Sequence, residues 1–459
     1  MNPEVPVSEP TQPRSNIVKV VAASMAGTTV EWYDFFLYGV AAALVFPKVF
    51  FPADDPTVGT LLALGTFAIG VSARPIGGVV FGHYGDRLGR KKLLVISLLM
   101  MGLATFAIGL LPGYATIGVA APAILVALRL IQGFALGGEW GGAILIVSEH
   151  GDPARRGYWA SWPQAGVPVG QLIANGLLAL LAFVQSPEAF LAWGWRIPFL
   201  MSAVLVLIGL YIRLSVEESP VFRAAHARAE ERAAAGEKET MPIIDVFRRY
   251  PREVFTAMGA RFAENVSYYI FTIVVITYLT DKQLHALPRS FVLNAVLIGA
   301  AVHLVAIPIW GALSDRLGRK PVYLFGAVGI GVWAFAFVYL VDTENFALTV
   351  LAVAVGLVLH AAMYGPQAAF LSELFGTNVR YSGVSIGYQL ASIVAGGLAP
   401  LIAVALYSGY DSGYSVALYV AASAVITVIA VATYQETGKR DLDNDAAFER
   451  ESVPSATRG

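Results

Sequence analysis

The hydrophobic residues of this chain form long uninterrupted runs separated by short polar segments. A helical run of about 20 apolar residues is long enough to cross a hydrocarbon layer about 30 Å thick. Membrane strands would instead show segments of about ten residues with alternating polarity, and the runs here do not alternate. Because lipid offers no partner to backbone polar groups, such runs fold as helices. The pattern therefore predicts an all-α membrane protein.

Twelve runs are expected to span the membrane. Their predicted limits are 18–46, 57–83, 92–111, 119–148, 158–184, 195–214, 253–280, 290–313, 321–341, 346–371, 382–407 and 413–434. The longest polar segment follows the sixth run, so two six-helix halves are expected. The predicted parts are a tail at 1–16, a first half at 17–214, a connecting loop at 215–251, a second half at 252–434 and a tail at 435–459. Residues 222–235 of the loop are expected to form a surface helix, and both tails to be disordered.

Composition agrees with a membrane protein. The 459 residues are 57% hydrophobic and 14% charged, whereas roughly 25% of the residues of a soluble domain are charged. The absence of cysteine excludes disulfides and thiolate metal sites. Residues 1–16 lack the short hydrophobic segment and cleavage site of a signal peptide, so they are interpreted as a cytoplasmic tail.

Lysine and arginine determine the expected orientation, because these residues accumulate in cytoplasmic loops. With both termini inside, the cytoplasmic segments contain most of the basic residues, among them Arg14, Lys19, Arg155, Arg156, Arg248, Arg249, Lys320 and Lys439. The opposite loops contain only Lys48, Lys282 and Arg289 as basic residues, beside Asp54, Asp55, Asp342, Glu344 and Asp411. The chain is therefore expected to be a multi-pass inner-membrane protein with both termini in the cytoplasm.

Two loops repeat nearly the same sequence, six spans apart. The first is Gly85-Asp86-Arg87-Leu88-Gly89-Arg90-Lys91 and the second is Ser314-Asp315-Arg316-Leu317-Gly318-Arg319-Lys320. Shorter matches pair the segment from Ser148-Glu149 to Arg156 with that from Ser372-Glu373 to Arg380, and residues 31–36 with 264–269. Matches separated by six spans predict a parallel repeat, in which an axis along the membrane normal relates the halves.

The segment from Gly82 to Lys91 resembles the signature loop of the major facilitator superfamily. Three further stretches resemble the metabolite:proton symporter family within it: residues 31–35 with Tyr38-Gly39, residues 129–133 through 137–142, and residues 380–383 through 396–400. That family includes permeases for proline and betaine, α-ketoglutarate, citrate and shikimate. The resemblance implies the major facilitator fold and proton-driven uptake of a small polar metabolite, often a carboxylate or a zwitterion.

Ionisable residues inside the predicted spans are the candidates for the functional site. A charge at the bilayer centre costs about 2.5–3.5 kcal/mol, so each needs a partner or a wet cavity. A proton-coupled carrier needs a carboxyl group whose protonation responds to its surroundings, and Glu31, Asp34 and Glu264 are the candidates. Arginine binds carboxylates bidentately without losing its proton, so Arg129 and Arg261 are candidates for holding an anionic substrate.

The working hypothesis is that substrate and a transmembrane carboxylate compete for an arginine. Protonation of Asp34 or Glu31 would then free Arg129 for the substrate. The alternative is a permanent structural pair, Arg129 with Asp34 or Arg261 with Glu264.

Uncharged polar residues in the spans have two interpretations. Tyr38, Gln164, Tyr268 and Tyr388 are candidates for contacting the substrate, with ordinary packing as the alternative. His303 and His360 are expected to be hydrogen-bonded core histidines, with proton carriage as the alternative.

The repeated loops are expected to close the cytoplasmic side. Asp86 and Asp315 can accept charge-assisted hydrogen bonds from arginines or from a helix N-terminus. The predicted gating residues are Gly82, Asp86, Arg87, Arg90, Asp315, Arg316 and Arg319. The simpler alternative is that these loops only determine the topology.

No motif for nucleotide binding, such as GxxxxGK(S/T), and no HExxH pattern occurs in the chain. We therefore expect no cofactor, metal or nucleic-acid partner, and no enzymatic activity. The expected partners are the lipid bilayer, protons and a small-molecule substrate, and the expected state is a monomer. The sequence favours a secondary active transporter that takes up a carboxylate with protons by alternating access. The alternatives are uptake of zwitterionic osmolytes such as proline or glycine betaine, and a nutrient sensor that does not transport.

Overall fold

The computed structural model describes residues 17–88, 90–137, 144, 147–148, 152–215, 246, 248–281, 284–376 and 380–438, without the side chains of 82–94, 212–215 and 381. The spans of the first half are α1 (Ile17–Leu44), α3 with α4 (Pro56–Ser72, Arg74–Leu88), α5 (Arg90–Leu110), α7 (Ala120–Leu136), α9 (Arg156–Val184) and α11 (Arg196–Ser215). Those of the second half are α14 with η3 and α15 (Pro251–Tyr269, Ile270–Val274, Val275–Thr280), α16 (Arg289–Leu317), α17 (Arg319–Val341), α18 (Phe346–Leu374), α19 with η4 and α20 (Arg380–Ala391, Ser392–Gly397, Ala399–Tyr410) and α21 (Tyr414–Ala432). Short helices lie between them: α2 (Phe46–Val49), α6 (Tyr114–Ile117), η1 (Pro153–Arg155), α10 (Pro187–Ala189) and η2 (Phe190–Gly194).

These elements confirm the predicted all-α fold with two six-helix halves. Eight of the described helices are long and apolar enough to cross a membrane, and the bent pair of Pro187–Gly194 with Arg196–Tyr211 makes a ninth. Val95–Leu110 and Ala120–Leu136 are shorter apolar helices. The remaining span, α1, has 28 residues and carries two carboxylates within its apolar sequence. The surface helix predicted at 222–235 lies outside the described residues.

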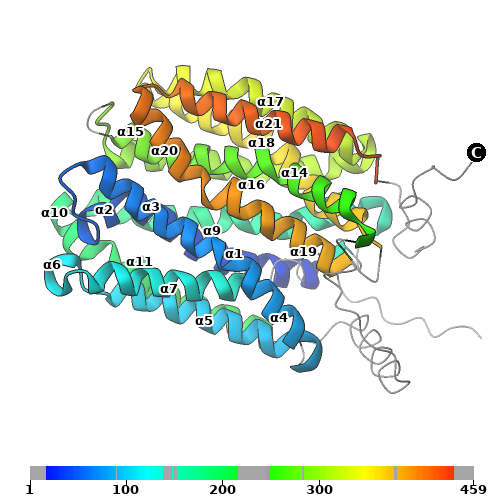
Figure 1. The fold of residues 1–459 in the computed structure, drawn as a ribbon, viewed down its shortest axis with the longest axis horizontal. Helices are drawn as coiled ribbons and strands as arrows, with labels where there is room; N and C mark the ends of the chain where they lie inside the picture. Colours follow the sequence, from blue (N-terminus) through cyan, green and yellow to red (C-terminus); the bar gives the residue numbers. More distant parts are fainter. Residues whose placement is uncertain are drawn as a thin grey trace, which may run out of the picture.

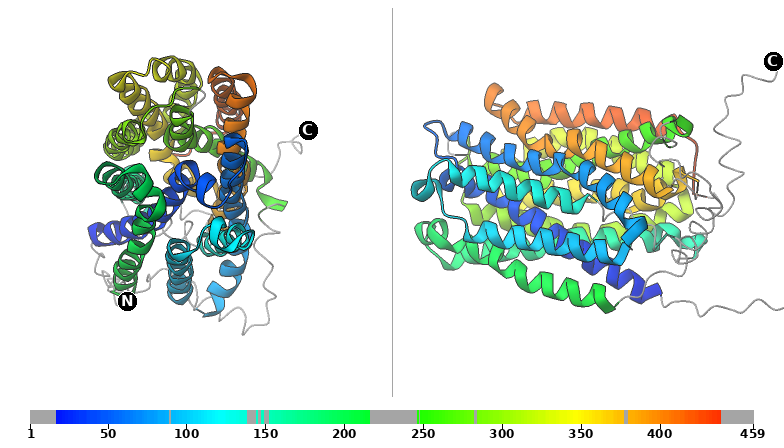
Figure 2. Two further views of the ribbon diagram at one scale, coloured as in Figure 1. Left: turned by 90° about the vertical axis from the view of Figure 1, so that its left-hand side faces the viewer. Right: turned by 60° about the horizontal axis from the view of Figure 1, so that its bottom comes forward.

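The helices run side by side along the long axis of the molecule (Figure 1). The end-on view of Figure 2 separates a bundle coloured blue to blue-green from one coloured green through yellow to orange. The two halves meet where α9 packs on α16 and α18, and where α3 packs on η4 and α20. In a parallel repeat the second span corresponds to the eighth and the fifth to the eleventh. The contact of α9 with α16 is therefore equivalent to the contact of α20 with α3, as the predicted repeat requires.

The first spans of the two halves occupy the centre of the bundle. Residues 30–42 of α1 are all buried, and 94% of the apolar window of α14 to α15 is buried as well. The other seven long apolar helices bury between 39% and 56% of their apolar windows, as expected when one face meets protein and the other meets lipid. The central position of α1 and α14 places their charged residues inside the molecule.

Glycines allow α7 to pack closely against α3 and α4. A methyl group added at Gly133 would overlap the carbonyl oxygen of Gly70, and one added at Gly137 would overlap that of Arg74. Small residues of this kind let the backbones of membrane helices approach.

We expect the substitution Gly133→Ala to lower the midpoint of thermal unfolding. Overpacking of a tight contact costs about 1–3 kcal/mol, and a carbonyl oxygen on the opposing backbone cannot move aside as a side chain can. Gly65→Ala on α3 is the matched control, because no heavy atom lies within 4 Å of the added methyl group. Equal midpoints for the two variants in a detergent-based thermal unfolding assay would refute this packing.

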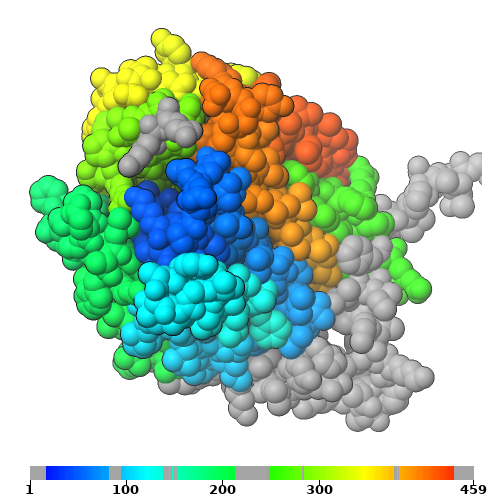
Figure 3. Space-filling view, turned by 60° about the vertical axis from the view of Figure 1, so that its left-hand side comes forward, coloured from blue at the N-terminus to red at the C-terminus, as the bar shows by residue number. Residues whose placement is uncertain are grey.

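The two ends of the bundle differ in charge. The basic end holds the loops with Arg155, Arg156, Arg316 and Lys320, and the acidic end holds those with Asp54, Asp55, Asp281, Asp342, Glu344 and Asp411. Figure 3 looks toward the acidic end, where blue segments of the first half lie against orange segments of the second. A pocket at this end is lined by two aspartates from each half, Asp54, Asp55, Asp281 and Asp411.

His285 connects two loops of the acidic end. Its Nδ1 atom lies 3.0 Å from Glu344 Oε1, and its Nε2 atom lies 3.4 Å from Asp342 Oδ1. Asp342 also accepts a hydrogen bond from the hydroxyl of Tyr278, at 2.7 Å. The hydrogen bond to Asp342 raises the pKa of His285, and Glu344 adds to this effect against the opposing influence of partial burial. The contact is therefore strongest when the imidazole is charged.

We expect the loop at 284–288 to open more readily as pH rises. A group whose folded-state pKa is raised stabilises the fold fully below its unfolded pKa, near 6.5 for histidine, and this stability is lost as pH rises through the folded-state pKa. Amide hydrogen exchange of this loop, corrected for intrinsic rates, should accelerate across that interval. The same pH dependence in a His285→Gln variant would contradict the assignment.

Candidate functional site

In the first half, Asp34 of α1 and Arg129 of α7 are joined through two other side chains. Thr105 Oγ1 donates to Asp34 Oδ2 at 2.8 Å, and Gln132 Nε2 donates to Thr105 Oγ1 at 2.6 Å. Arg129 Nη1 donates to Gln132 Oε1 at 2.9 Å. All four residues are buried. The direct Arg129–Asp34 pair considered from the sequence is therefore absent, and Arg129 has no ion pair within the part of the chain that the structure describes.

Two buried guanidinium groups lie on aromatic rings in this half. Arg129 lies 3.7 Å from the ring centroid of Tyr38, and Arg74 of α4 lies 5.0 Å from that of Phe35. Arg129 interacts electrostatically with the like charge of Arg74 and with the opposite charge of Asp34. The Nε atoms of both are buried without a hydrogen-bond partner. Neither cation is neutralised by an ion pair to a described residue.

In the second half, Arg261 is paired directly. Its Nη1 atom lies 2.6 Å from Glu264 Oε2, three positions along α14. Its guanidinium also lies 3.6 Å from the ring centroid of Tyr388. Further hydrogen bonds join it to Gln367 (2.9 Å), Asn265 (3.1 Å) and Ser392 (3.2 Å). The structure therefore contains the Arg261–Glu264 pair that the sequence left as an alternative.

Glu264 is also hydrogen-bonded to a chain of two histidines. Its Oε1 atom lies 3.3 Å from His360 Nε2, and His360 Nδ1 lies 2.9 Å from His303 Nε2. The chain crosses from α14 to α18 and then to α16. Both histidines are hydrogen-bonded and buried, as expected, but their bonds lead to a candidate proton-binding carboxylate. The sequence contains no spacing that relates His303, His360 and Glu264.

The remaining candidates lie at the contact between the halves. Tyr268 of α14 donates to Gln171 Oε1 of α9 at 3.2 Å, and Gln164 Nε2 of α9 donates to the carbonyl oxygen of Tyr364 at 3.5 Å. Glu31 on α1 is 8% exposed. The structure thus brings Tyr38 to Arg129 and Tyr388 to Arg261, and it places Tyr268 and Gln164 at the interface of the halves.

Aromatic side chains from both halves form a cluster, in which Phe35 and Phe67 contact Arg74 and Arg129. Trp32, Phe35 and Phe36 of α1 pack on Phe67, Tyr268 and Tyr269, with ring centroids 4.8 to 6.4 Å apart. One of these six, Tyr268, was predicted from the sequence to contact the substrate. An aromatic residue in an apolar span gives no signal that separates a lining residue from core packing.

At the basic end, Asp315 joins the halves. Its carboxylate accepts hydrogen bonds from the backbone N–H groups of Gly157 (2.7 Å) and Tyr158 (2.9 Å), at the N-terminus of α9 in the other half. Arg319 Nη1 donates to the same carboxylate at 2.7 Å. A helix N-terminus and an arginine are the partners expected for this aspartate. Arg316 is exposed, and the side chains of Gly82, Asp86, Arg87 and Arg90 lie outside the described residues.

Glu373 makes a second contact between the halves and was not predicted as a gating residue. This carboxylate is fully buried and lies 3.2 Å from Arg156 of the first half and 3.2 Å from Arg319 of the second. Thr437 donates to it at 2.8 Å. The repeat drew attention to Glu373, but its partner Arg156 is 217 positions away in the sequence. Local spacing therefore gave no sign of the pair.

The start of the C-terminal tail belongs to the fold, contrary to the expected disorder. Glu436 accepts hydrogen bonds from the backbone N–H groups of Arg319 (2.7 Å) and Lys320 (2.9 Å). The first N–H groups of a helix have no partner within it, so the glutamate caps α17. This contact and that of the buried Thr437 hold the tail in place as far as residue 438.

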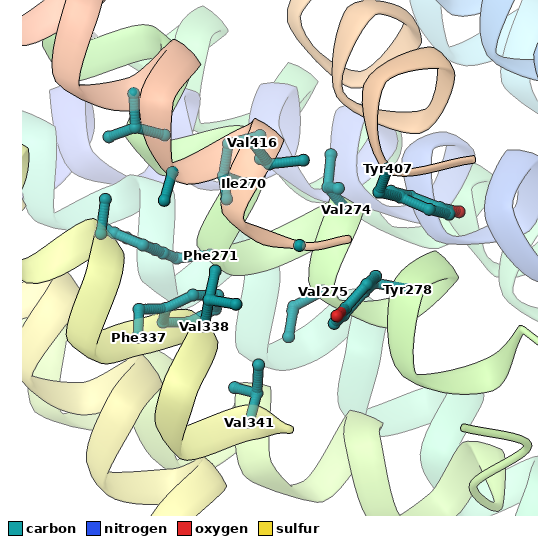
Figure 4. A pocket seen from close by; sticks show the side chains of 14 residues that line it. Ile270, Phe271, Val274, Val275, Tyr278, Phe337, Val338, Val341, Tyr407 and Val416 are labelled. Atoms are coloured by element: carbon teal, nitrogen blue, oxygen red, sulfur yellow. The ribbon is translucent and has the colours of Figure 1, made fainter. Parts of the chain in front are cut away.

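A different pocket in the second half has apolar walls. Figure 4 shows side chains of η3, α15, α17, α20 and α21 around it, with the hydroxyls of Tyr278 and Tyr407 as the oxygen atoms among the labelled side chains. No charged residue lines it. The buried arginines and carboxylates, and not this pocket, therefore form the candidate site.

Comparison with known proteins connects this arrangement to transport. Residues 19–446 match the family model described as "Sugar (and other) transporter". The chain is 43% identical over 427 residues to the inner membrane metabolite transport protein YhjE of Escherichia coli, covering 92% of this chain and 95% of that protein. It is 40% identical over 413 residues to the shikimate transporter of Escherichia coli (90% and 93% covered), and 34% identical over 431 residues to the proline/betaine transporter of Escherichia coli (92% and 84% covered). The solved structure of the proton:xylose symporter XylE superposes with a TM-score of 0.72 at 17% identity over 94% of this chain and 98% of that one, which shows a common fold.

Proposed function

This chain belongs to the sugar (and other) transporter family of the major facilitator superfamily, and on that premise we propose that it takes up a small carboxylate together with protons by alternating access. It is a multi-pass membrane transporter and not an enzyme. The observation that carries the substrate class is the pair of buried arginines in the first half, Arg74 and Arg129, which have no ion pair among the described residues. A buried cation without a direct ion pair is costly, and an anionic substrate would supply the partner.

The chemistry of arginine supports a carboxylate as that anion. Its planar guanidinium forms two parallel hydrogen bonds to a carboxylate, and the buried Nε of Arg129 is without a partner. The shikimate transporter, 40% identical to this chain, is named for a carboxylate. In our proposal Arg129 binds the substrate, with Tyr38 beneath its guanidinium and Gln132 beside it.

Proton coupling would then operate through Asp34 in the first half. Protonation removes one negative charge from the chain that runs from Asp34 through Thr105 and Gln132 to Arg129. The positive charge of the two arginines is then less compensated, so affinity for an anion rises. Loss of the proton reverses the change and releases the substrate. Glu31 and Glu264 remain the other carboxylates proposed to couple.

The charge difference between the ends supports an orientation in the membrane. Because basic loops stay in the cytoplasm, we place the basic end and both termini on that side of the inner membrane. Asp315, Arg319 and Glu373 then close the cytoplasmic side in the arrangement seen here, and these contacts must break for the substrate to leave. We propose that the protein works as a monomer.

A zwitterion such as glycine betaine or proline is the second candidate. Aromatic faces bind quaternary ammonium groups, and the cluster around Trp32 and Tyr268 lies beside the arginines. The acidic end would also attract a positively charged group. The proline/betaine transporter relative shows that both substrate types occur among similar proteins.

Counterflow in proteoliposomes tests the proposal. Vesicles loaded with unlabelled shikimate should accumulate labelled shikimate transiently, whereas exchange of glycine betaine or proline should be weaker. Preferential exchange of glycine betaine or proline would show that the substrate is a zwitterion, the second candidate, and not a carboxylate. A chain that binds these compounds in a thermal-shift assay but exchanges none of them would be a sensor, and the proposal of transport would fail.

A further inference from the structure

We propose that Glu264, His360 and His303 form a proton relay in the second half, in which His303 Nδ1 receives the proton and Glu264 stores it. This inference rests on the proposed proton-coupled function and names a second site for a proton, beside Asp34 of the first half. The three groups come from α14, α18 and α16, and hydrogen bonds of 3.3 and 2.9 Å join them. None is more than 3% exposed.

The hydrogen bonds fix which ring nitrogens carry hydrogen when both imidazoles are neutral. An ionised carboxylate can only accept, so His360 Nε2 must donate to Glu264. His360 Nδ1 is then a bare acceptor, and His303 Nε2 must donate to it. His303 Nδ1 is left with a free lone pair, and this atom is buried with no hydrogen-bond partner. The chain therefore ends in a vacant proton acceptor.

A proton can pass along this chain while both hydrogen bonds persist, with donor and acceptor reversed in each. A proton from water binds His303 Nδ1 as the Nε2 hydrogen moves to His360 Nδ1, and the His360 Nε2 hydrogen moves to Glu264. Both imidazoles end neutral with hydrogen on Nδ1, and Glu264 ends as a carboxylic acid. One proton has entered and one is stored. Arg261, which lies 2.6 Å from Glu264, loses its ionised partner and becomes able to bind an anion.

The surroundings of the relay connect it to the contact between the halves. The ring of Tyr268 stacks on His360 at 4.7 Å, and its hydroxyl reaches Gln171 of the other half. Tyr364 lies against both imidazoles, and its carbonyl oxygen accepts from Gln164 of the other half. Among the described residues, the titratable and charged groups facing the relay are Arg261, Tyr268 and Tyr269 on α14, Tyr323 on α17, Tyr364 on α18 and Tyr388 on α19. Rocking of the halves would expose or cover His303.

Nitrogen-15 NMR of the histidine-labelled protein in lipid tests the relay without any substrate. Signals are assigned by their loss in His303→Gln and His360→Gln variants. The wild type should show both imidazoles neutral with hydrogen on Nε2. In a Glu264→Gln variant the amide oxygen stays with Arg261, which can only donate, so the amide NH₂ turns to His360. Both rings should then switch to hydrogen on Nδ1. Hydrogen on His303 Nδ1 in the wild type, or no switch in the variant, would overturn the proposal.

Transport separates failure of the relay from failure of the proposed function. The probe is labelled shikimate, or glycine betaine if the counterflow screen selects it. The His303→Gln variant should keep counterflow but accumulate less than the wild type under an inward proton gradient, because only the coupling through Asp34 is left. His285→Gln, a histidine change at the acidic end, should accumulate as the wild type does. Gradient-driven accumulation by His303→Gln at the wild-type level would overturn the relay alone. If the wild type itself shows no gradient-driven accumulation, proton coupling is overturned instead. The NMR measurement of which ring nitrogens of His303 and His360 carry hydrogen would then test the relay.

Discussion

Replacing Arg129 by alanine is expected to lower carboxylate uptake by about 10- to 100-fold, since a hydrogen bond to a charged group contributes about 1.5–3 kcal/mol and each 1.4 kcal/mol is tenfold. Within the described part of the chain, its guanidinium donates one hydrogen bond, to Gln132, and has no ion pair. The loss should therefore appear in substrate affinity more than in folding. Uptake of labelled shikimate over a range of concentrations measures this directly.

Two further variants make the result specific. Arg129→Lys keeps the charge but not the planar pair of donors, so it should recover part of the uptake. Arg249→Ala removes an exposed arginine near the basic end and should leave uptake unchanged. Uptake by Arg129→Ala at the wild-type rate and affinity would show that this arginine is structural and would remove the main support for an anionic substrate.

The second large effect is expected at Glu373. This fully buried carboxylate lies 3.2 Å from Arg156 and 3.2 Å from Arg319, which belong to opposite halves. Glu373→Gln keeps the shape and removes the charge. Breaking a buried ion pair on one side costs about 3–5 kcal/mol. Part of this cost is relieved if the halves separate and water reaches the arginines. We therefore expect the variant to favour the state that is open at the basic end.

Cysteine labelling can measure this opening, because the natural chain contains no cysteine. Ser161 of α9 is fully buried, one turn beyond the Tyr158 contact to Asp315. A Ser161→Cys change introduces a single thiol there. It should react with an impermeant maleimide applied to the basic end much faster when Glu373→Gln is present. Glu253→Gln, a carboxylate change outside the contact, should not alter the rate. Equal labelling in all three backgrounds would contradict a gating role.

The fold was predictable because long apolar runs and a six-span repeat leave few other arrangements. The charged centre was also predictable in part, since Asp34, Arg129, Arg261 and Glu264 stand out in apolar helices. Their partners were not. Residues on every face of α1 and α14 are buried, so hydrophobic periodicity does not tell which face meets which neighbour.

The pairings that the sequence missed join residues far apart in the chain. His303, His360 and Glu264 meet only because α16, α18 and α14 take particular rotations about their axes. Likewise, the polar composition of the tail at 435–459 predicts disorder at Glu436, yet its side chain caps α17. The composition of a segment indicates whether it can form a hydrophobic core of its own. It does not indicate whether the segment binds to the rest of the molecule.

The central claim is that a carboxylate and a proton cross together, and the most direct measurement follows protons while substrate moves. Proteoliposomes containing a pH indicator dye are given shikimate outside, with no other gradient. The proposed mechanism predicts that the lumen acidifies as shikimate enters the wild type, and that an Asp34→Asn variant exchanges shikimate in counterflow but acidifies the lumen less per shikimate that enters. Entry of shikimate into wild-type vesicles with no change in internal pH would contradict it.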